Sequence, residues 1–176
     1  MPGGLRGATA GRKLAPRDSA PAGRGRPTGG VLIFEAKIGA VQRILEETWS
    51  RGNLDPIDEL VAADYLGHDP VLGDADREAL KERIRSYRTS FPDLTFEIED
   101  IFEAGDKVVT RWRATGTFES EFMGMEPTRE QGPPVTGISI DRFEEGYVVE
   151  SWGEWNALQL MQNIGALPEG ATASAD

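Results

Sequence analysis

The residues best suited to acid/base chemistry begin with His68 and Asp69 in the string GHDP, where His68 is the only histidine of the chain. A histidine changes its charge near neutral pH and can act as a general base beside a carboxylate. Neighbouring residues of an extended segment point in opposite directions, so these two side chains need not touch. The alternative is a loop histidine bonded to a backbone carbonyl, with Asp69 beginning a turn before Pro70.

Two further carboxylates, Asp141 and Glu154, lie on segments with the two-residue alternation of β-strands. Asp141 shares a face with Ser139, and would be an acid near the open end of a cavity if that face points inward. A buried Glu154 with a raised pKa would be a competent base. If Gly153 faces inward, however, alternation places Glu154 on the outer face. A solvated carboxylate is the alternative for Glu154, and a carboxylate paired with an arginine is the alternative for Asp141.

A pair of arginines, Arg111 and Arg113, shares one face of a predicted strand, with Trp112 on the other. Inside a cavity, a guanidinium would bind a carboxylate or stabilise an enolate oxygen. The alternative is that both arginines lie on a solvated or dimer-facing surface.

Aromatic and thioether side chains could form the wall of a pocket for a flat, apolar ligand. The expected ligand-binding residues are aromatic and thioether side chains together with the hydroxyl of one serine. They are Trp112, Phe118, Phe122, Met123, Met125, Ser139, Trp152 and Trp155. Core packing would explain each apolar member singly. The loop 119–134 is expected to act as a lid over this pocket.

Composition narrows the possible chemistry. The chain of 176 residues has no cysteine and one histidine, which excludes disulfides, a cysteine nucleophile and multi-histidine metal sites. The segment 1–30 has six basic residues and one acidic residue, whereas the remainder has a net charge of −16. A domain this acidic repels phosphate, so we expect no nucleic-acid partner. We also expect no membrane partner, because no apolar run is long enough to span a bilayer.

The periodicity of apolar residues predicts helices first and strands afterwards. Three-to-four-residue spacing predicts a helix from Val31 to Trp49 and further helices over 53–65, 77–91 and 156–165, with a loop over 65–76. Alternation predicts antiparallel strands over 94–102, 107–118, 135–143 and 147–155. This order is typical of an α+β fold, in which three N-terminal helices pack on one face of a strongly curved antiparallel sheet and a short C-terminal helix follows. We expect a disordered basic tail over 1–30, one domain over 31–168 and a frayed end over 169–176.

Several strings of this chain, in this order and spacing, resemble the SnoaL-like polyketide cyclase family of the nuclear transport factor two-like superfamily. They are YLGHDP at 65–70, FPDLTFEIEDIFEAGDKVVTRWRATGTF at 91–118, EFMGMEPT at 121–128, VTGISIDRFEEGYVVESW at 135–152 and LQLMQNIG at 158–165. The resemblance implies a cone-shaped barrel with a hydrophobic cavity, a homodimer formed through the sheet, and ring closure of a polyketide by aldol condensation without a cofactor. We also expect a cytoplasmic protein.

The resemblance also implies an acid/base aspartate directly after the tryptophan of the last strand. Trp152 matches that tryptophan, but Gly153 stands where the aspartate is expected, Asn156 replaces a second frequent aspartate, and Ser139 lies where an assisting histidine would fall. The aldol machinery of the characterised cyclases therefore does not transfer to this chain.

Three hypotheses follow. The chain is a cofactor-independent cyclase or isomerase of a small hydrophobic, polyketide-like metabolite that uses some of His68, Asp69, Asp141 and Glu154. Alternatively, it is a non-catalytic module of the same fold that binds a small hydrophobic molecule, which the loss of the aspartate favours. An epoxide hydrolase-like site would need an Asp–Arg–Asp arrangement, of which Arg111 or Arg113 with Asp141 supplies only part.

Overall fold

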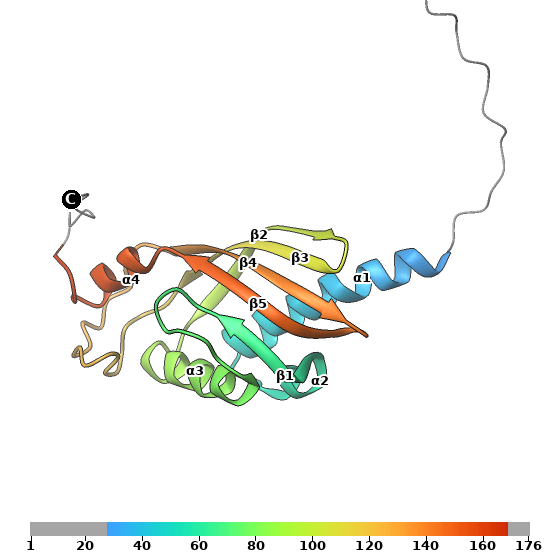
Figure 1. Cartoon of the computed structure of the whole chain (residues 1–176). Helices are drawn as coiled ribbons and strands as arrows, with labels where there is room; N and C mark the ends of the chain where they lie inside the picture. The colour runs from blue at the N-terminus through green and yellow to red at the C-terminus, as the bar shows by residue number, and fades with distance from the viewer. Residues whose placement is uncertain (1–27, 169–176) are drawn as a thin grey trace, which may run out of the picture.

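A five-stranded curved sheet forms the centre of the molecule in the computed structural model, which describes residues 28–168. Its strand order is β1-β5-β4-β3-β2, and the sheet does not close into a barrel (Figure 1). The strands are β1 (Val61–His68), β2 (Thr95–Ala104), β3 (Lys107–Thr115), β4 (Val135–Glu144) and β5 (Tyr147–Trp155). Strands β2 to β5 pair antiparallel, and β1 pairs parallel with β5.

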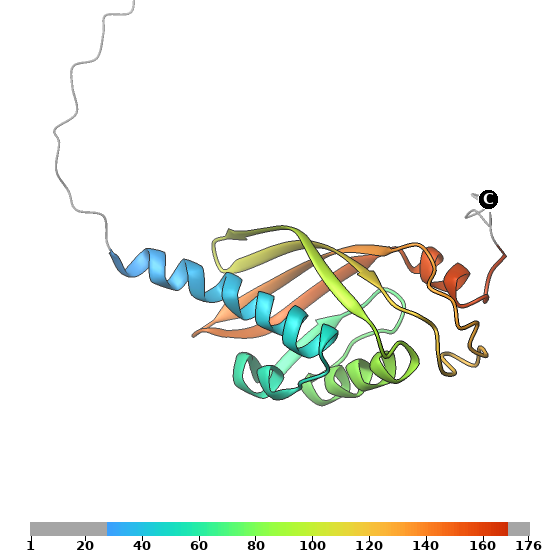
Figure 2. The ribbon, with the colours of Figure 1, turned by 180° about the vertical axis from the view of Figure 1, so that it is seen from behind.

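The N-terminal helices cover one face of this sheet, as Figure 2 shows. They are α1 (Thr28–Arg43), which continues into the wider π-helical turn η1 (Ile44–Ser50), then α2 (Asp55–Leu60) and α3 (Arg77–Ser90). Asp76 begins α3, because its side chain accepts a hydrogen bond from the backbone amide of Ala79. Asn156 caps the short C-terminal helix α4 (Ala157–Asn163) in the same way, through the amide of Gln159.

The structure corrects three of the expected elements. The second helix does not extend over 53–65. It ends at Leu60, and the chain continues as β1 through the end of the expected helix and the first four residues of the expected loop. The sheet consequently has five strands, one of them parallel. The strand expected to reach Phe118 ends at Thr115, and the first helix begins at Thr28, ahead of the expected Val31.

Strand β1 forms where the sequence resembled a helix, and its burial alternates over the second half of the strand. Val61, Tyr65 and Gly67 are buried, whereas Leu66 between them is exposed. The strand gains backbone hydrogen bonds from β5, and this tertiary pairing outweighs the helical propensity of the alanines in the segment. Tyr65 and His68 are therefore placed at one edge of the sheet, beside β5.

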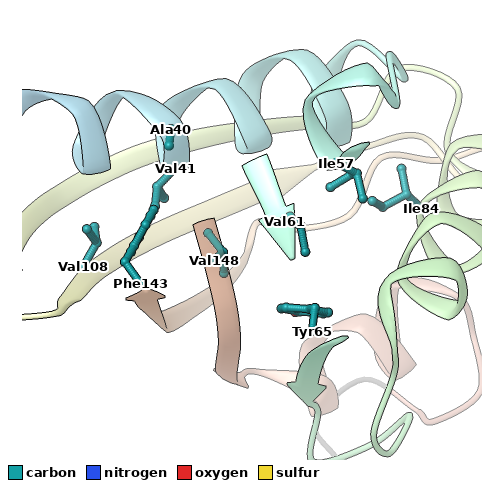
Figure 3. Close-up of a cluster of buried hydrophobic side chains, with 9 residues drawn as sticks. All are labelled: Ala40, Val41, Ile57, Val61, Tyr65, Ile84, Val108, Phe143 and Val148. Atoms are coloured by element: carbon teal, nitrogen blue, oxygen red, sulfur yellow. The ribbon is translucent and has the colours of Figure 1, made fainter. Parts of the chain in front are cut away.

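The buried side chains form two clusters on the helix-covered face. The first joins β1, β3, β4 and β5 to α1, α2 and α3, and Figure 3 shows Val41 of α1 pointing toward Phe143 of β4 within it. The second gathers around Trp112 and Phe118 and includes Leu160 and Ile164 at the C-terminal end. A cavity borders both clusters and separates parts of the sheet from the helices.

The remaining expectations about the ends of the chain concern residues 1–27 and 169–176, which lie outside the described residues. Within residues 28–168, none of the helices combines the length and the apolar character that a membrane crossing requires.

Candidate functional site

The inner face of the sheet presents its side chains to the cavity in rows that cross neighbouring strands. One row pairs Asp141 of β4 with Ser151 of β5, and Ser151 with Gly67 of β1. The next row pairs Thr110 of β3 with Ser139 of β4, and Ser139 with Gly153 of β5. All six residues line the cavity.

A third row consists of Trp112, Gly137 and Trp155, and it makes the cavity aromatic beyond the polar rows. The ring of Trp112 lies across Gly137, since a Cβ atom there would lie 2.4 Å from the Trp112 ring. The glycine therefore admits the indole, whose Nε1 donates to Ser139 Oγ at 2.9 Å.

The cavity has a volume of roughly 210 Å³. Pockets for drug-sized ligands span about 300 to 1,000 Å³, and an engineered cavity of about 150 Å³ holds benzene. A ligand of one or two rings fits this space best. Its apolar walls come from helices as well as strands, and include Val41, Ile44, Leu45, Trp49, Leu80, Tyr87, Phe91, Leu94, Phe96 and Leu160.

Asp141 is the carboxylate that the structure places on the cavity floor. Its Oδ1 accepts a hydrogen bond from Ser151 Oγ at 2.5 Å. Burial raises the pKa of Asp141 to about 6, and the Ser151 hydrogen bond opposes that rise. A carboxylate that titrates near neutral pH can both accept and return a proton, which is what general acid/base catalysis requires.

Tyr65 extends this polar group at the edge of the sheet. Its hydroxyl hydrogen-bonds with Ser151, and burial raises its pKa to about 12, with the charge of nearby Asp141 raising it further. Tyr65 is only 7% exposed. The phenol therefore stays protonated, and Ser151 joins it to Asp141 in a chain of three residues.

Asp69 lines the cavity but already has several hydrogen-bond partners. Its Oδ1 accepts from the backbone amides of Val71 and Leu72, both at 2.8 Å. Its Oδ2 accepts from Trp155 Nε1 at 3.2 Å and lies 3.7 Å from Arg83 Nη1. Asp69 thus fixes the turn after β1, as the alternative reading held, and also orients the Trp155 ring.

His68 directs its side chain away from the cavity. It pairs with Trp152 on the face opposite Gly67 and Ser151, and its ring stacks on that indole at 5.6 Å. Nε2 lies 3.0 Å from Glu150 and Nδ1 lies 3.1 Å from Asp74. These carboxylates, Glu150 more than Asp74, raise the pKa of His68. His68 lies at the border of the cavity, but both of its ring nitrogens are already paired with carboxylates on the outer face.

The other charged candidates also lie on the outer face. Glu154 is exposed and does not line the cavity. Arg111 pairs with Asp100 at 2.7 Å and with Glu99, and Arg113 pairs with Glu97 at 2.9 Å. The arginines therefore form cross-strand ion pairs at the surface and cannot reach a ligand in the cavity.

The expected ligand-binding residues divide into two groups. Trp112, Ser139 and Trp155 border the cavity from the inner face of the sheet, whereas Trp152 borders it from the opposite face, where its indole stacks on His68. Phe118 and Phe122 instead pack in the second buried cluster with Met125 against it, and Met123 is 52% exposed. Of the expected lid 119–134, Gly132 and Pro133 line the cavity.

The model of the SnoaL-like polyketide cyclase family matches residues 39–164, most of the chain. The chain belongs to the SnoaL-like polyketide cyclase family. The comparison with curated proteins found no match for this chain.

Solved structures of this family share the fold. AclR, a candidate hydroxylase from Streptomyces galilaeus, has a TM-score of 0.70 and 25% identity over 78% of this chain and 86% of its own. A candidate SnoaL-like polyketide cyclase from Jannaschia sp. CCS1 has a TM-score of 0.70 and 23% identity over 83% of this chain and all of its own. IdmH, a candidate polyketide cyclase from Streptomyces antibioticus, has a TM-score of 0.64 and 28% identity over 73% of this chain and 98% of its own.

Within this SnoaL-like cyclase fold, Gly153 leaves open space. The atom nearest to a Cβ built at Gly153 is the His68 carbonyl oxygen, 4.0 Å away. The position expected to carry the acid/base aspartate therefore faces the cavity and carries no side chain. Across β4, the same row holds the hydroxyls of Ser139 and Thr110.

Sequence reasoning missed three polar residues of this SnoaL-like site. Tyr65 and Arg83 line the cavity, but the first was assigned to a helix and the second carried no motif. Thr110 was read only as part of a strand. The available signal was its position two residues before Trp112, because alternation places both residues on one face of the strand. The structure shows that this is the inner face.

Proposed function

We propose that this chain is a cofactor-independent enzyme that moves protons on a small, mostly apolar carbonyl compound, with Asp141 as the general acid/base. The observation that carries the proposal is a carboxylate with a pKa of about 6 on the floor of a cavity whose walls are mostly apolar and aromatic. The family expectation of ring closure or isomerisation is retained, but the proton acceptor is moved from position 153 to position 141.

The proposed reaction needs only groups that line the cavity. Asp141 takes a proton from the carbon next to a carbonyl group. The C–H electron pair forms a C=C bond, and the π pair of the carbonyl group moves to its oxygen to give an enolate. In an isomerisation, protonated Asp141 returns the proton to a different carbon. In a ring closure, the enolate carbon attacks a second carbonyl of the same molecule, and protonated Asp141 protonates the new alkoxide.

Deuterium exchange from D₂O into small cyclic ketones and 1,3-diketones tests this proposal without knowledge of the natural substrate. The wild-type protein should catalyse exchange at the carbon next to the carbonyl, and Asp141→Asn should reduce the rate at least 100-fold, the lower range for general-base catalysis. His68→Gln should retain it, because that side chain lies outside the cavity. Equal rates for wild-type protein and Asp141→Asn would remove Asp141 from the mechanism.

A binding module is the second candidate, and Gly153 is the observation that favours it. If the chain only binds, a ligand that stabilises the fold should bind equally well to wild-type protein and Asp141→Asn without being converted. The epoxide hydrolase alternative has less support. Arg83 approaches Asp69 within 3.7 Å, but among residues 28–168 no ion pair or hydrogen bond links Arg83 to Asp141.

We also propose a homodimer formed through the outer face of the sheet. Ile138 is 47% exposed there, between the strands that carry Arg111 and Glu154. Sedimentation equilibrium should give a dimer for the wild-type protein and a monomer for Ile138→Asp. A wild-type monomer at micromolar concentration would contradict this assignment.

A further inference from the structure

The side-chain hydroxyl of Thr110 is buried and has no hydrogen-bond partner in the part of the chain that the structure describes. The residue is 0% exposed, and its Oγ1 has no hydrogen-bond partner within the described chain. It lies on the inner face of β3 and lines the cavity. A buried polar group without a partner is rare in proteins and costs stability, so its retention at a cavity wall points to a ligand that supplies the missing partner.

Ser139 places a second hydroxyl directly beside Thr110. The two residues are register partners on β3 and β4, and opposite side chains of antiparallel strands have Cβ atoms about 5 Å apart. Ser139 Oγ accepts the indole hydrogen of Trp112 at 2.9 Å, which leaves its own hydrogen available to donate. Two donors at this spacing can both reach one oxygen atom.

We propose that the hydroxyls of Thr110 and Ser139 bind the carbonyl oxygen of the substrate and stabilise it as the enolate forms. Asp141 follows Ser139 by two residues on the same face, about 7 Å along the strand. A carbonyl oxygen held in the Thr110–Ser139 row therefore directs its neighbouring carbon toward the Asp141 row. The inference rests on the proposed function and names its substrate class, an enolisable ketone with one or two rings.

The open space at Gly153 fits the same arrangement. Gly153 is the register partner of Ser139 on β5, so the row consists of two hydroxyls followed by a position without a side chain. A substrate can lie over Gly153 with its oxygen between the hydroxyls. The aromatic row of Trp112 and Trp155 would then contact the rings of the substrate.

The test measures the binding of phenols, from phenol to 2-naphthol, whose oxygen on a planar carbon resembles that of an enol and, when ionised, that of an enolate. Naphthalene is the matched ligand without an oxygen. The wild-type protein should bind 2-naphthol more tightly than naphthalene. Thr110→Val, which keeps the shape of the side chain, should weaken 2-naphthol binding about tenfold and leave naphthalene binding unchanged, the effect of one lost hydrogen bond.

Thr48 supplies a matched control. It is the other buried threonine whose hydroxyl lacks a partner in the described chain, and it does not line the cavity. Both Thr48→Val and Thr110→Val should melt at or above the wild-type temperature, because each removes an unpaired buried hydroxyl. Only Thr110→Val should lose affinity for 2-naphthol.

The possible outcomes separate this inference from the proposed function. Unchanged 2-naphthol affinity in Thr110→Val, an equal loss for naphthalene, or no phenol binding by the wild-type protein would each overturn the oxygen site. Deuterium exchange that depends on Asp141 would still support the proposed function in those cases. Weakened 2-naphthol binding in Thr110→Val with exchange independent of Asp141 would support the oxygen site and reject the base.

Discussion

Ser151 donates its hydroxyl hydrogen to Asp141 at 2.5 Å, and the two residues are direct register partners on β4 and β5. The pairing is set by the hairpin that joins these strands, so it does not depend on a mobile loop. It gives a buried carboxylate one strong hydrogen bond while leaving its charge poorly solvated. Burial therefore raises the pKa of Asp141 to about 6, and the hydrogen bond from Ser151 opposes that rise.

The first prediction is that Asp141→Asn stabilises the protein at neutral pH. The folded-state pKa of Asp141 lies above its unfolded value of 3.8, so its favourable contribution is present below about pH 4 and is lost as pH rises through about 6. Asparagine does not titrate. The variant should gain on the order of 2 kcal/mol at pH 7.5 relative to pH 4, or roughly 4 to 8 °C in melting temperature.

Glu154→Gln is the control for this measurement, because Glu154 is exposed on the outer face of the same sheet. Its melting temperature should follow that of the wild-type protein between pH 4 and pH 7.5. An Asp141→Asn variant that shows no greater stabilisation at pH 7.5 than at pH 4 would mean that the carboxylate is well solvated in the folded state.

A second prediction concerns Ser151 itself. Because its hydrogen bond lowers the pKa of Asp141, Ser151→Ala should raise that pKa further, by about one unit for a hydrogen bond to a charged group. The pH at which deuterium exchange reaches half its maximum should move upward by the same amount. Ser86→Ala, an exposed serine of α3, should leave the midpoint in place. A downward shift in Ser151→Ala would contradict the assignment.

The third prediction uses the single histidine of the chain, whose proton NMR signals cannot overlap with those of another. Glu150 and Asp74 raise the pKa of His68, so its titration midpoint should lie above 6.5. The stability that His68 contributes is then present below 6.5 and lost as pH rises through the folded-state pKa.

Replacing each carboxylate by its neutral amide shows how much each partner contributes to the raised pKa of His68. Glu150→Gln should lower the His68 midpoint more than Asp74→Asn does, because Glu150 is the larger cause. Glu154→Gln, on the same face of β5, should leave the midpoint unchanged. A wild-type midpoint at or below 6.5 would show that, in solution, these carboxylates do not stabilise the protonated form of His68.

The sequence predicted the parts of this site that depend on local alternation. Strands β4 and β5 begin where expected, and β5 also ends there, so alternation predicts that Asp141 shares a face of β4 with Ser139 and that Trp155 shares a face of β5 with Gly153. Both faces line the cavity in the structure, because alternation determines which residues share a face and the buried partners determine which face points inward.

The rest depended on pairing between distant segments, which local patterns do not encode. The segment 61–68 has helix-forming residues and becomes a strand only because β5 supplies its partner, so Tyr65 could not be placed beside Ser151. The phenylalanines of the loop after β3 have the composition of a ligand wall, but Phe118 is buried in the second core cluster. Composition alone does not distinguish a cavity wall from the core behind it.

The last prediction is that a carboxylate at position 153 can replace the one at position 141. Gly153 has space for a side chain, since a Cβ there would meet only the His68 carbonyl oxygen at 4.0 Å. Gly153→Asp should therefore fold, whereas Gly137→Asp should not, because its Cβ would lie 2.4 Å from the Trp112 ring. In the Asp141→Asn background, Gly153→Asp should restore deuterium exchange at least tenfold.

The physical reason is that both positions face the same cavity and are separated by one row of the sheet, with Ser139 and Thr110 in the row of Gly153. Gly153→Asn in the same background has the same shape without a base and should remain inactive. In the wild-type background, Gly153→Asp adds a second carboxylate near Asp141, and like charges should raise both pKa values. A folded double variant that binds 2-naphthol but shows no exchange would mean that a base at position 153 cannot reach the reacting carbon.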